Sequence, residues 1–180
     1  MSDVRLGTDR LVLRDHTLDD FCAYRRFWAE QACDVPGGPP RTAEEVWYRL
    51  VFLIGHWRVF RYGLFLAIDP TSNEIIGEIG FRRMERSSAP LTSEREGGWN
   101  LGRAHRSQGL ASEAMICARD WMDTHHPGRQ SCFIDVENTA SIRLAKVLGF
   151  EAVSEHEYNS SKVTLFERPA PQQCGAPPAI

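Results

Sequence analysis

The stretch from Arg106 to Ala114, Arg-Ser-Gln-Gly-Leu-Ala-Ser-Glu-Ala, constrains the fold more than any other part of the chain. It predicts a glycine-bearing loop that runs directly into an amphipathic helix. The N-terminus of a helix presents unpaired backbone N–H groups and the positive end of the helix dipole. Because Gly109 has no side chain to keep a ligand away, we expect residues 107–111 to cradle an anion, with phosphate as the expected ligand.

The pattern along the rest of the chain predicts alternating strands and helices. Thr42 and Glu45 form a capping box at the start of the second helix, and Gly149 takes the C′ position after the last one. The expected strands are residues 10–14, 64–69, 74–82, 94–101, 130–136, 152–158 and 162–167, and the expected helices are residues 17–32, 42–57, 106–122 and 139–148. This order indicates an α/β (α+β) fold, in which helices pack on the faces of a mixed sheet.

Length and composition are those of a globular protein. The chain has 180 residues, enough for a full hydrophobic core, and 42% of them are hydrophobic. We expect a single domain over residues 1–168. Residues 169–180 are rich in proline and poor in core-forming side chains, so we expect a disordered tail there.

The net charge and the lengths of the apolar runs limit the kinds of partner that the protein is expected to bind. The net charge of −3 does not favour nucleic acid. The longest apolar run, Val51–Ile54, is far too short to span a membrane. The N-terminus has no signal-peptide pattern, so we expect a cytoplasmic protein.

The sequence does not predict a metal site. The five cysteines have no metal-binding spacing and are expected to be buried and reduced; they are Cys22, Cys33, Cys117, Cys132 and Cys174. The adjacent His125 and His126 point in different directions on a helix.

Three blocks of sequence resemble one protein family. Arg106-x-x-Gly109-x-Ala111 resembles the acetyl-CoA signature, Q/R-x-x-G-x-G/A, of the GNAT superfamily of N-acetyltransferases. Within that superfamily, residues 8–14, 96–114 and 137–150 are similar to the RimJ/RimL-type branch. The resemblance covers residues 8–168 and implies a GNAT-like mixed, mostly antiparallel central sheet of about seven strands flanked by about four helices.

The resemblance also implies a reaction, in which a primary amine attacks the thioester of acetyl-CoA directly and the CoA thiolate leaves. The implied acceptor is a protein N-terminus or a small-molecule amine. An α-amine, with a pKa of roughly 7.7–8.0, needs less help than a lysine amine at roughly 10.4. A homodimer is compatible with the sequence, and the alternative function is a non-catalytic acyl-CoA sensor.

The residues that the resemblance assigns to acetyl-CoA lie in three places. The backbone of Asn100 and Leu101 would donate to the thioester carbonyl. Asn138 would hold the pantetheine arm; the alternative is an ordinary N-cap. Arg143 would hold the adenosine phosphates; the alternative is a solvated position on the helix face. The pyrophosphate would be held by Arg106, Ser107, Gln108, Gly109, Leu110 and Ala111.

Glu96 and Ser141 are the predicted catalytic residues. Glu96 matches the general base of this branch; the alternative is a solvated carboxylate on an edge strand. Ser141 matches a position near the CoA sulfur and would protonate the thiolate; the alternative is an ordinary helix hydroxyl. Many family members carry a tyrosine as general acid where this chain has Ala145, so either Ser141 or water takes that role or the activity is slow.

Several other residues are predicted to be structural. Glu78, which lies between Gly77 and Gly80, is expected at the surface, with a role near the substrate as the alternative. Glu113 is expected to pack or cap. The aromatic residues of the first two helices are expected in the core, with a wall of the acceptor site as the alternative; they are Trp28, Trp47, Trp57 and Tyr62.

Overall fold

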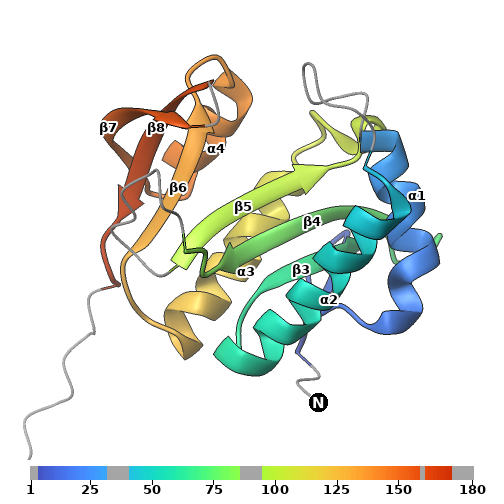
Figure 1. The fold of residues 1–180 in the computed structure, drawn as a ribbon. Helices are drawn as coiled ribbons and strands as arrows, with labels where there is room; N and C mark the ends of the chain where they lie inside the picture. The colour runs from blue at the N-terminus through green and yellow to red at the C-terminus, as the bar shows by residue number, and fades with distance from the viewer. Residues whose placement is uncertain (1–3, 32–40, 86–94, 159–160, 172–180) are drawn as a thin grey trace, which may run out of the picture.

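The computed structural model describes residues 4–31, 41–85, 95–158 and 161–171. Its eight strands form one sheet in the order β1-β2-β3-β4-β5-β6-β8-β7 (Figure 1). The strands are β1 (Arg5–Gly7), β2 (Val12–Arg14), β3 (Leu64–Ile68), β4 (Ile75–Arg82), β5 (Arg95–Leu101), β6 (Gln130–Asp135), β7 (Glu151–Tyr158) and β8 (Ser161–Arg168). The helices of the described segments are α1 (Phe21–Gln31), α2 (Ala43–Phe60), α3 (Leu110–His125) and α4 (Thr139–Val147), with short 3₁₀ turns η1 (Leu18–Asp20) and η3 (Arg103–His105).

The predicted α/β (α+β) class and the order of elements are confirmed. The sheet has one strand more than expected, because β1 pairs with β2 over only three residues, too few to give an alternating pattern. The helix expected after Thr17 begins as the 3₁₀ turn η1, which Thr17 caps, and continues as α1. Residues 159–160 and 172–180, on which the expected hairpin turn and most of the expected tail fall, lie outside the described residues.

Helices cover both faces of the sheet centre, with α1 and α2 on one face and α3 on the other (Figure 1). The short strand β3 requires cover on both faces, because all five of its side chains are apolar and buried. Leu64, Leu66 and Ile68 pack with α1 and α2, whereas Phe65 and Ala67 pack with α3. A continuous apolar run is therefore what a strand covered on both faces requires.

The sheet is split between β5 and β6. The antiparallel ladder from β4 to β5 is continuous from Gly77↔Leu101 to Arg82↔Glu96. The parallel ladder from β5 to β6 has only the register pairs Arg95↔Gln130 and Glu96↔Ser131. Beyond Glu96 the two strands diverge (Figure 1), and β6 continues beside β8. The last five residues of β5 therefore have no strand partner on that side.

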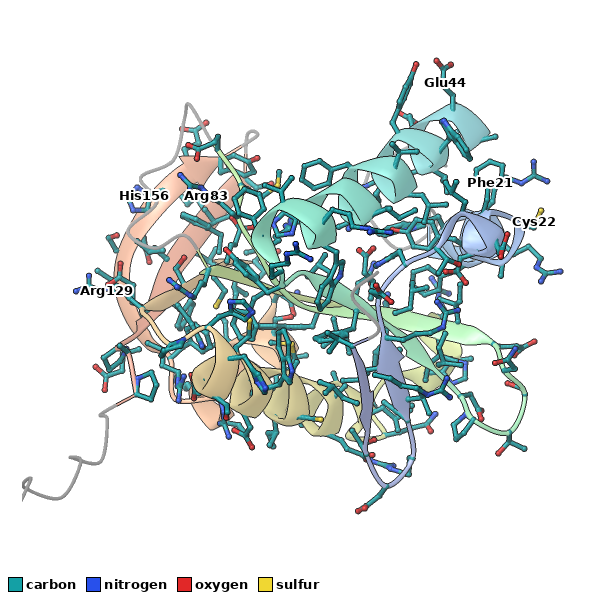
Figure 2. The ribbon with its side chains drawn as sticks, turned by 90° about the horizontal axis from the view of Figure 1, so that it is seen from below. Phe21, Cys22, Glu44, Arg83, Arg129 and His156 are labelled. Atoms are coloured by element: carbon teal, nitrogen blue, oxygen red, sulfur yellow. The ribbon has the colours of Figure 1, made fainter. Side chains whose placement is uncertain are left out.

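On the outer sides of α1 and α2, the expected burial of Cys22 and Trp47 is wrong. Trp47 is 41% exposed on the outer side of α2, whereas Trp28, Trp57 and Tyr62 are buried as predicted. Cys22 is exposed on the outer side of α1 (Figure 2), because the buried side of this helix is taken by larger aromatic side chains. Cys132 is buried and Cys117 half-buried; Cys33 and Cys174 lie outside the described residues.

No helix in the described part of the chain has both the length and the apolarity to cross a bilayer. In the same part of the chain, no three histidine, cysteine, aspartate or glutamate side chains are grouped so that they could hold a metal ion.

The junction between α2 and β3 gives a stability prediction. The indole Nε1 of Trp57 donates to the carbonyl of Leu64 at 2.7 Å, and a Cβ on Gly63 would lie 2.5 Å from that nitrogen. Gly63→Ala should therefore lower the free energy of unfolding by about 1–3 kcal/mol, the usual cost of overpacking a core. Urea unfolding followed by tryptophan fluorescence measures the change.

Gly55→Ala is the matched control, because Gly55 lies within α2 with no atom within 4 Å of a Cβ. This substitution should stabilise the protein by about 0.5–1 kcal/mol, since alanine favours helix. Equal effects of the two substitutions would show that the packing around Trp57 is not as tight as described.

Candidate active site

The loop between β5 and α3 has the backbone of an anion cradle. Ser107 and Gly109 both take left-handed conformations, with φ of 60° and 79°, and α3 begins immediately after Gly109. A serine rarely adopts positive φ, and such conformations occur frequently at ligand sites. The turn brings the N-terminus of α3, with its unpaired N–H groups and positive dipole end, beside the end of β5.

Side-chain hydrogen bonds and an ion pair hold this loop in place. Arg106 Nε donates to the carbonyl of Leu101 at 3.0 Å, which ties the loop back to β5. Arg10 donates through Nη1 to the carbonyl of Gln108 at 3.0 Å and pairs through Nη2 with Glu113 at 2.7 Å. Glu113 thus has the structural role predicted for it. The side chain of Gln108 donates to the carbonyl of Ala104 at 2.8 Å.

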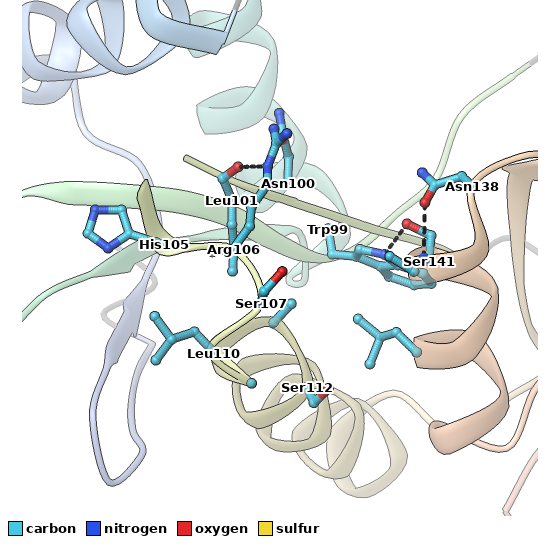
Figure 3. Close-up of a pocket in the computed structure, with 14 residues that line it drawn as sticks. Trp99, Asn100, Leu101, His105, Arg106, Ser107, Leu110, Ser112, Asn138 and Ser141 are labelled. Carbon is cyan, nitrogen blue, oxygen red and sulfur yellow. Dashed lines mark hydrogen bonds between the residues drawn. The ribbon is translucent and has the colours of Figure 1, made fainter. Parts of the chain in front are cut away.

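A first cavity of about 520 Å³ lies between this loop, the end of β5 and α4 (Figure 3). Most of the residues that the sequence assigned to acetyl-CoA line it. Gln108 and Arg143 are not among its lining residues, and Arg143 is exposed on α4. The lining is formed by Trp99, Asn100, Leu101, His105, Arg106, Ser107, Gly109, Leu110, Ala111, Ser112, Asn138, Ala140, Ser141 and Leu144.

A chain of hydrogen bonds joins β5 to α4 across the split. The Asn138 side chain accepts from the backbone N–H of Ser141 at 3.0 Å, which caps α4 as the sequence predicts. The indole Nε1 of Trp99 donates to the Ser141 hydroxyl at 3.1 Å (Figure 3). Because the hydroxyl accepts from the indole, its own proton remains available for a group in the cavity. Trp99 is not among the predicted site residues, although its place directly before Asn100 in the predicted strand was an available signal.

A second cavity of about 350 Å³ approaches β5 from the side of α1, α2 and β4. Trp99, Asn100, Asn138 and Ser141 line both cavities. A molecule in one cavity and a molecule in the other would therefore meet at Trp99 and Ser141. The other residues that line the second cavity are Trp28, Arg49, Leu64, Glu78, Arg82, Glu96, Gly97, Gly98, Cys132, Phe133, Ile134, Asp135, Tyr158 and Val163.

Glu96 lines the second cavity, and only 5% of the residue is exposed. β5 is a central strand, so the alternative of a solvated edge carboxylate does not apply. Oε1 of Glu96 lies 3.4 Å from Nη2 of Arg82, its cross-strand partner on β4. This carboxylate is well placed to act on a group in the second cavity.

Cys132 also lines this cavity, but it is a poor nucleophile. Burial, and next the negative charge of Glu96, raise the pKa of its thiol well above the ordinary value. The thiol therefore stays protonated at neutral pH, whereas nucleophilic attack requires the thiolate.

Glu78 is buried rather than exposed, so the expectation of a surface residue is wrong. The residue is 2% exposed and pairs with Arg49, while Tyr24 OH donates to its carboxylate. His16 Nε2 lies 3.3 Å from the same carboxylate. Burial would raise the pKa of Glu78, but the charges and hydrogen bonds of Arg49 and His16 hold it well below the usual range. Sequence reasoning could not foresee these partners, which come from three distant segments.

Ala145, where many family members carry a tyrosine, is fully buried in the apolar core. In the part of the chain that the structure describes, Ser141 is the only hydroxyl-bearing side chain that lines both cavities.

Known proteins share this architecture. The family model described as an acetyltransferase (GNAT) domain matches residues 10–151. A putative GNAT-family acetyltransferase from Bordetella pertussis has a TM-score of 0.85 and 32% identity, and the match covers 92% of this chain and 99% of that one. An uncharacterized N-acetyltransferase of Bacillus licheniformis, p20, is 28% identical over 166 residues, 90% of this chain and 91% of p20.

The fold is also that of RimL, a ribosomal α-N-protein acetyltransferase solved in complex with coenzyme A. It has a TM-score of 0.73 and 18% identity, with 92% of this chain and 98% of that chain covered. At this identity the similarity shows the fold alone.

Asn138 gives a stability prediction that separates its role as a cap from any contact with a ligand. Asn138→Ala should lower the free energy of unfolding by about 1 kcal/mol, because the N–H of Ser141 loses its acceptor. Asn138→Ser keeps a capping oxygen and should cost less than half as much. Thermal unfolding of the protein without ligand measures both, and equal losses would show that the cap does not stabilise α4.

Proposed function

The chain belongs to the acetyltransferase (GNAT) family of acetyl-CoA-dependent acyltransferases, and we propose that it transfers the acetyl group directly to a primary amine held in the second cavity. The observation that carries this proposal is the meeting of two cavities at Trp99, Asn100, Asn138 and Ser141. The first suits acetyl-CoA and the second an acceptor, so both reactants can be present at once.

The groups that line the first cavity fit acetyl-CoA. The backbone N–H groups at the start of α3 and the helix dipole suit the pyrophosphate, with Gly109 leaving room for close approach. Leu110 and Leu144 supply apolar walls for the pantetheine arm. At the end of β5, Asn100 and Gly102 point their backbone groups toward β4, whereas Leu101 has no strand partner toward β6. The backbone N–H of Leu101 therefore suits the thioester carbonyl.

Glu96 acts as the general base in this proposal. An amine must lose a proton before or during attack on the thioester carbon, and the buried carboxylate of Glu96 accepts it, directly or through a water molecule. Arg82, at 3.4 Å, keeps Glu96 oriented along the cavity.

Ser141 acts as the proton donor to the leaving thiolate, and a water molecule returns a proton to its hydroxyl as it does so, because a serine alkoxide is far more basic than a thiolate. A thiol has a pKa of roughly 8.5, so its thiolate needs only modest help. The Ser141 hydroxyl accepts a hydrogen bond from Trp99, so the proton of the hydroxyl points elsewhere and can be donated to the sulfur. This arrangement replaces the tyrosine that Ala145 cannot supply.

Direct attack is favoured over an acetyl-enzyme intermediate. Among the described residues, Cys132 is the only cysteine that lines either cavity, and its thiol is held protonated. The lack of a reactive thiol in the described lining supports attack of the amine on the thioester itself.

The alternative function is a non-catalytic acyl-CoA sensor. It is favoured by Ala145, which stands where many family members carry the tyrosine that acts as general acid. The deciding experiment measures thiol release from acetyl-CoA with a panel of N-terminal peptides, lysine peptides and small amines. Mass spectrometry identifies the acetylated product. Tight binding of acetyl-CoA without any acetylated amine would support the sensor.

Glu96→Gln should lower kcat by about 100-fold or more, the usual contribution of a general base, and leave the affinity for acetyl-CoA unchanged. Glu85→Gln is the control, since the side chain of Glu85 is 84% exposed and paired with Arg83; it should leave kcat unchanged. An unaltered kcat in Glu96→Gln would remove Glu96 from the role of base.

Trp99 and Ser141 should act as one unit. Ser141→Ala should lower kcat by about 10-fold, below the usual range for a general acid because the thiolate is a weak base. Trp99→Phe should lower kcat severalfold in the native protein but have little further effect in Ser141→Ala. A double-mutant cycle tests this coupling, and additive losses would show that Trp99 does not act through Ser141.

A further inference from the structure

A buried charge cluster borders the second cavity and has no part in the chemistry described so far. Glu78 of β4 lies at its centre. Arg49 of α2, Tyr24 of α1 and His16, which follows β2, converge on it. Burying a charged cluster is costly unless every member is well paired, and its position beside the cavity points to a use in binding.

Arg49 is held rigidly by this cluster. Its Nη2 pairs with Glu78 and its Nε donates to Tyr24 OH at 2.9 Å. Its guanidinium also stacks over the ring of Trp28, 4.9 Å from the ring centre. A guanidinium has five N–H donors, so these two hydrogen bonds fix its position without using its whole capacity.

In both buried ion pairs of the second cavity, the arginine is the more accessible member. The side chains of Arg49 and Arg82 are 20% and 19% exposed, whereas those of their partners Glu78 and Glu96 are 1% and 6% exposed. A molecule that enters the cavity therefore meets guanidinium groups before it reaches either carboxylate.

Two further charged residues, one of each sign, lie near these pairs. A third guanidinium, that of Arg41, lies 4.7 Å from the ring centre of Trp28, which lines the cavity. The acidic residue of the opposite wall, Asp135, uses its Oδ1 to accept from the backbone N–H of Glu137 at 2.9 Å. The local backbone thus partly satisfies the one exposed carboxylate of the lining.

We propose that Arg49 selects amine acceptors that carry a carboxylate close to the amine. The planar fork of a guanidinium matches the two oxygens of a carboxylate. With that group on Arg49, the amine extends toward Glu96 and the shared wall of the two cavities. Glu78 is then a positioning residue, which holds Arg49 in place and charged. This inference rests on the proposed function, because it concerns the acceptor of that reaction.

Two sources supply this chemistry, a free amino acid and a peptide with an acidic residue near its N-terminus. The test therefore uses two matched sets of acceptors with the full chain and acetyl-CoA. One set compares a pool of amino acids with the corresponding amino-acid amides. The other compares tripeptide amides with glutamate at the second position against those with glutamine there.

We expect the carboxylate members of at least one set to be acetylated with a kcat/KM about 10-fold or more above their neutral partners, which is about 1.4 kcal/mol. The set that shows this preference identifies the source. In the double variant Arg49→Met/Glu78→Gln the preference should fall to within about twofold, with the loss in KM rather than kcat.

The double substitution removes both charges, so neither is left buried and unpaired, and thermal unfolding confirms that it folds. Arg58→Met is the control, because Arg58 is an exposed arginine on the same helix; it should keep the preference.

Three outcomes count against the inference. Equal acetylation of carboxylate and neutral acceptors in both sets overturns it but leaves the proposed function intact. Persistence of the preference in the folded double variant shows that another group reads the carboxylate and overturns the role of Arg49. Failure to acetylate any amine in either set overturns the inference, and it overturns the proposed function as well when the small amines and lysine peptides of the panel also stay unmodified.

Discussion

The site depends on the short ladder between β5 and β6, which ends after the pair Glu96↔Ser131. Beyond this pair the backbone of β5 has hydrogen-bonding groups without a strand partner, and such groups need partners. The Trp99–Ser141 hydrogen bond spans the gap where the ladder stops. The two cavities share this stretch of chain, so the split both opens the sheet and joins one binding space to the other.

The two cavities are built by different physical means. Backbone geometry dominates the first, through the left-handed Ser107 and Gly109 and the N-terminus of α3. Side-chain charge dominates the second, where Arg49 and Arg82 neutralise two carboxylates and keep some exposed surface of their own. A backbone cradle suits the phosphate groups of a constant co-substrate, and a lining of side chains on separate elements suits selection among acceptors.

Local signals in the sequence predicted the fold and the first cavity well. The Thr42–Glu45 capping box, the Asn138 cap and the left-handed Gly149 depend on neighbouring residues, and all are found as predicted. The burial of Glu78 and the bond from Trp99 to Ser141 depend on contacts between residues 29 to 62 positions apart. Periodicity carries no information on such contacts. Likewise, motif position could not reveal that Gln108 bonds to its own loop.

Initial-rate kinetics with acetyl-CoA and an acceptor amine varied together test the central claim, that both substrates meet across the split sheet. Direct transfer predicts intersecting double-reciprocal plots and no acetylated protein after incubation with acetyl-CoA alone. Parallel plots, together with an acetyl group on Cys132 found by peptide mass spectrometry, would contradict the account. That result would mean that the thiol, although buried, carries the acetyl group between two separate half-reactions.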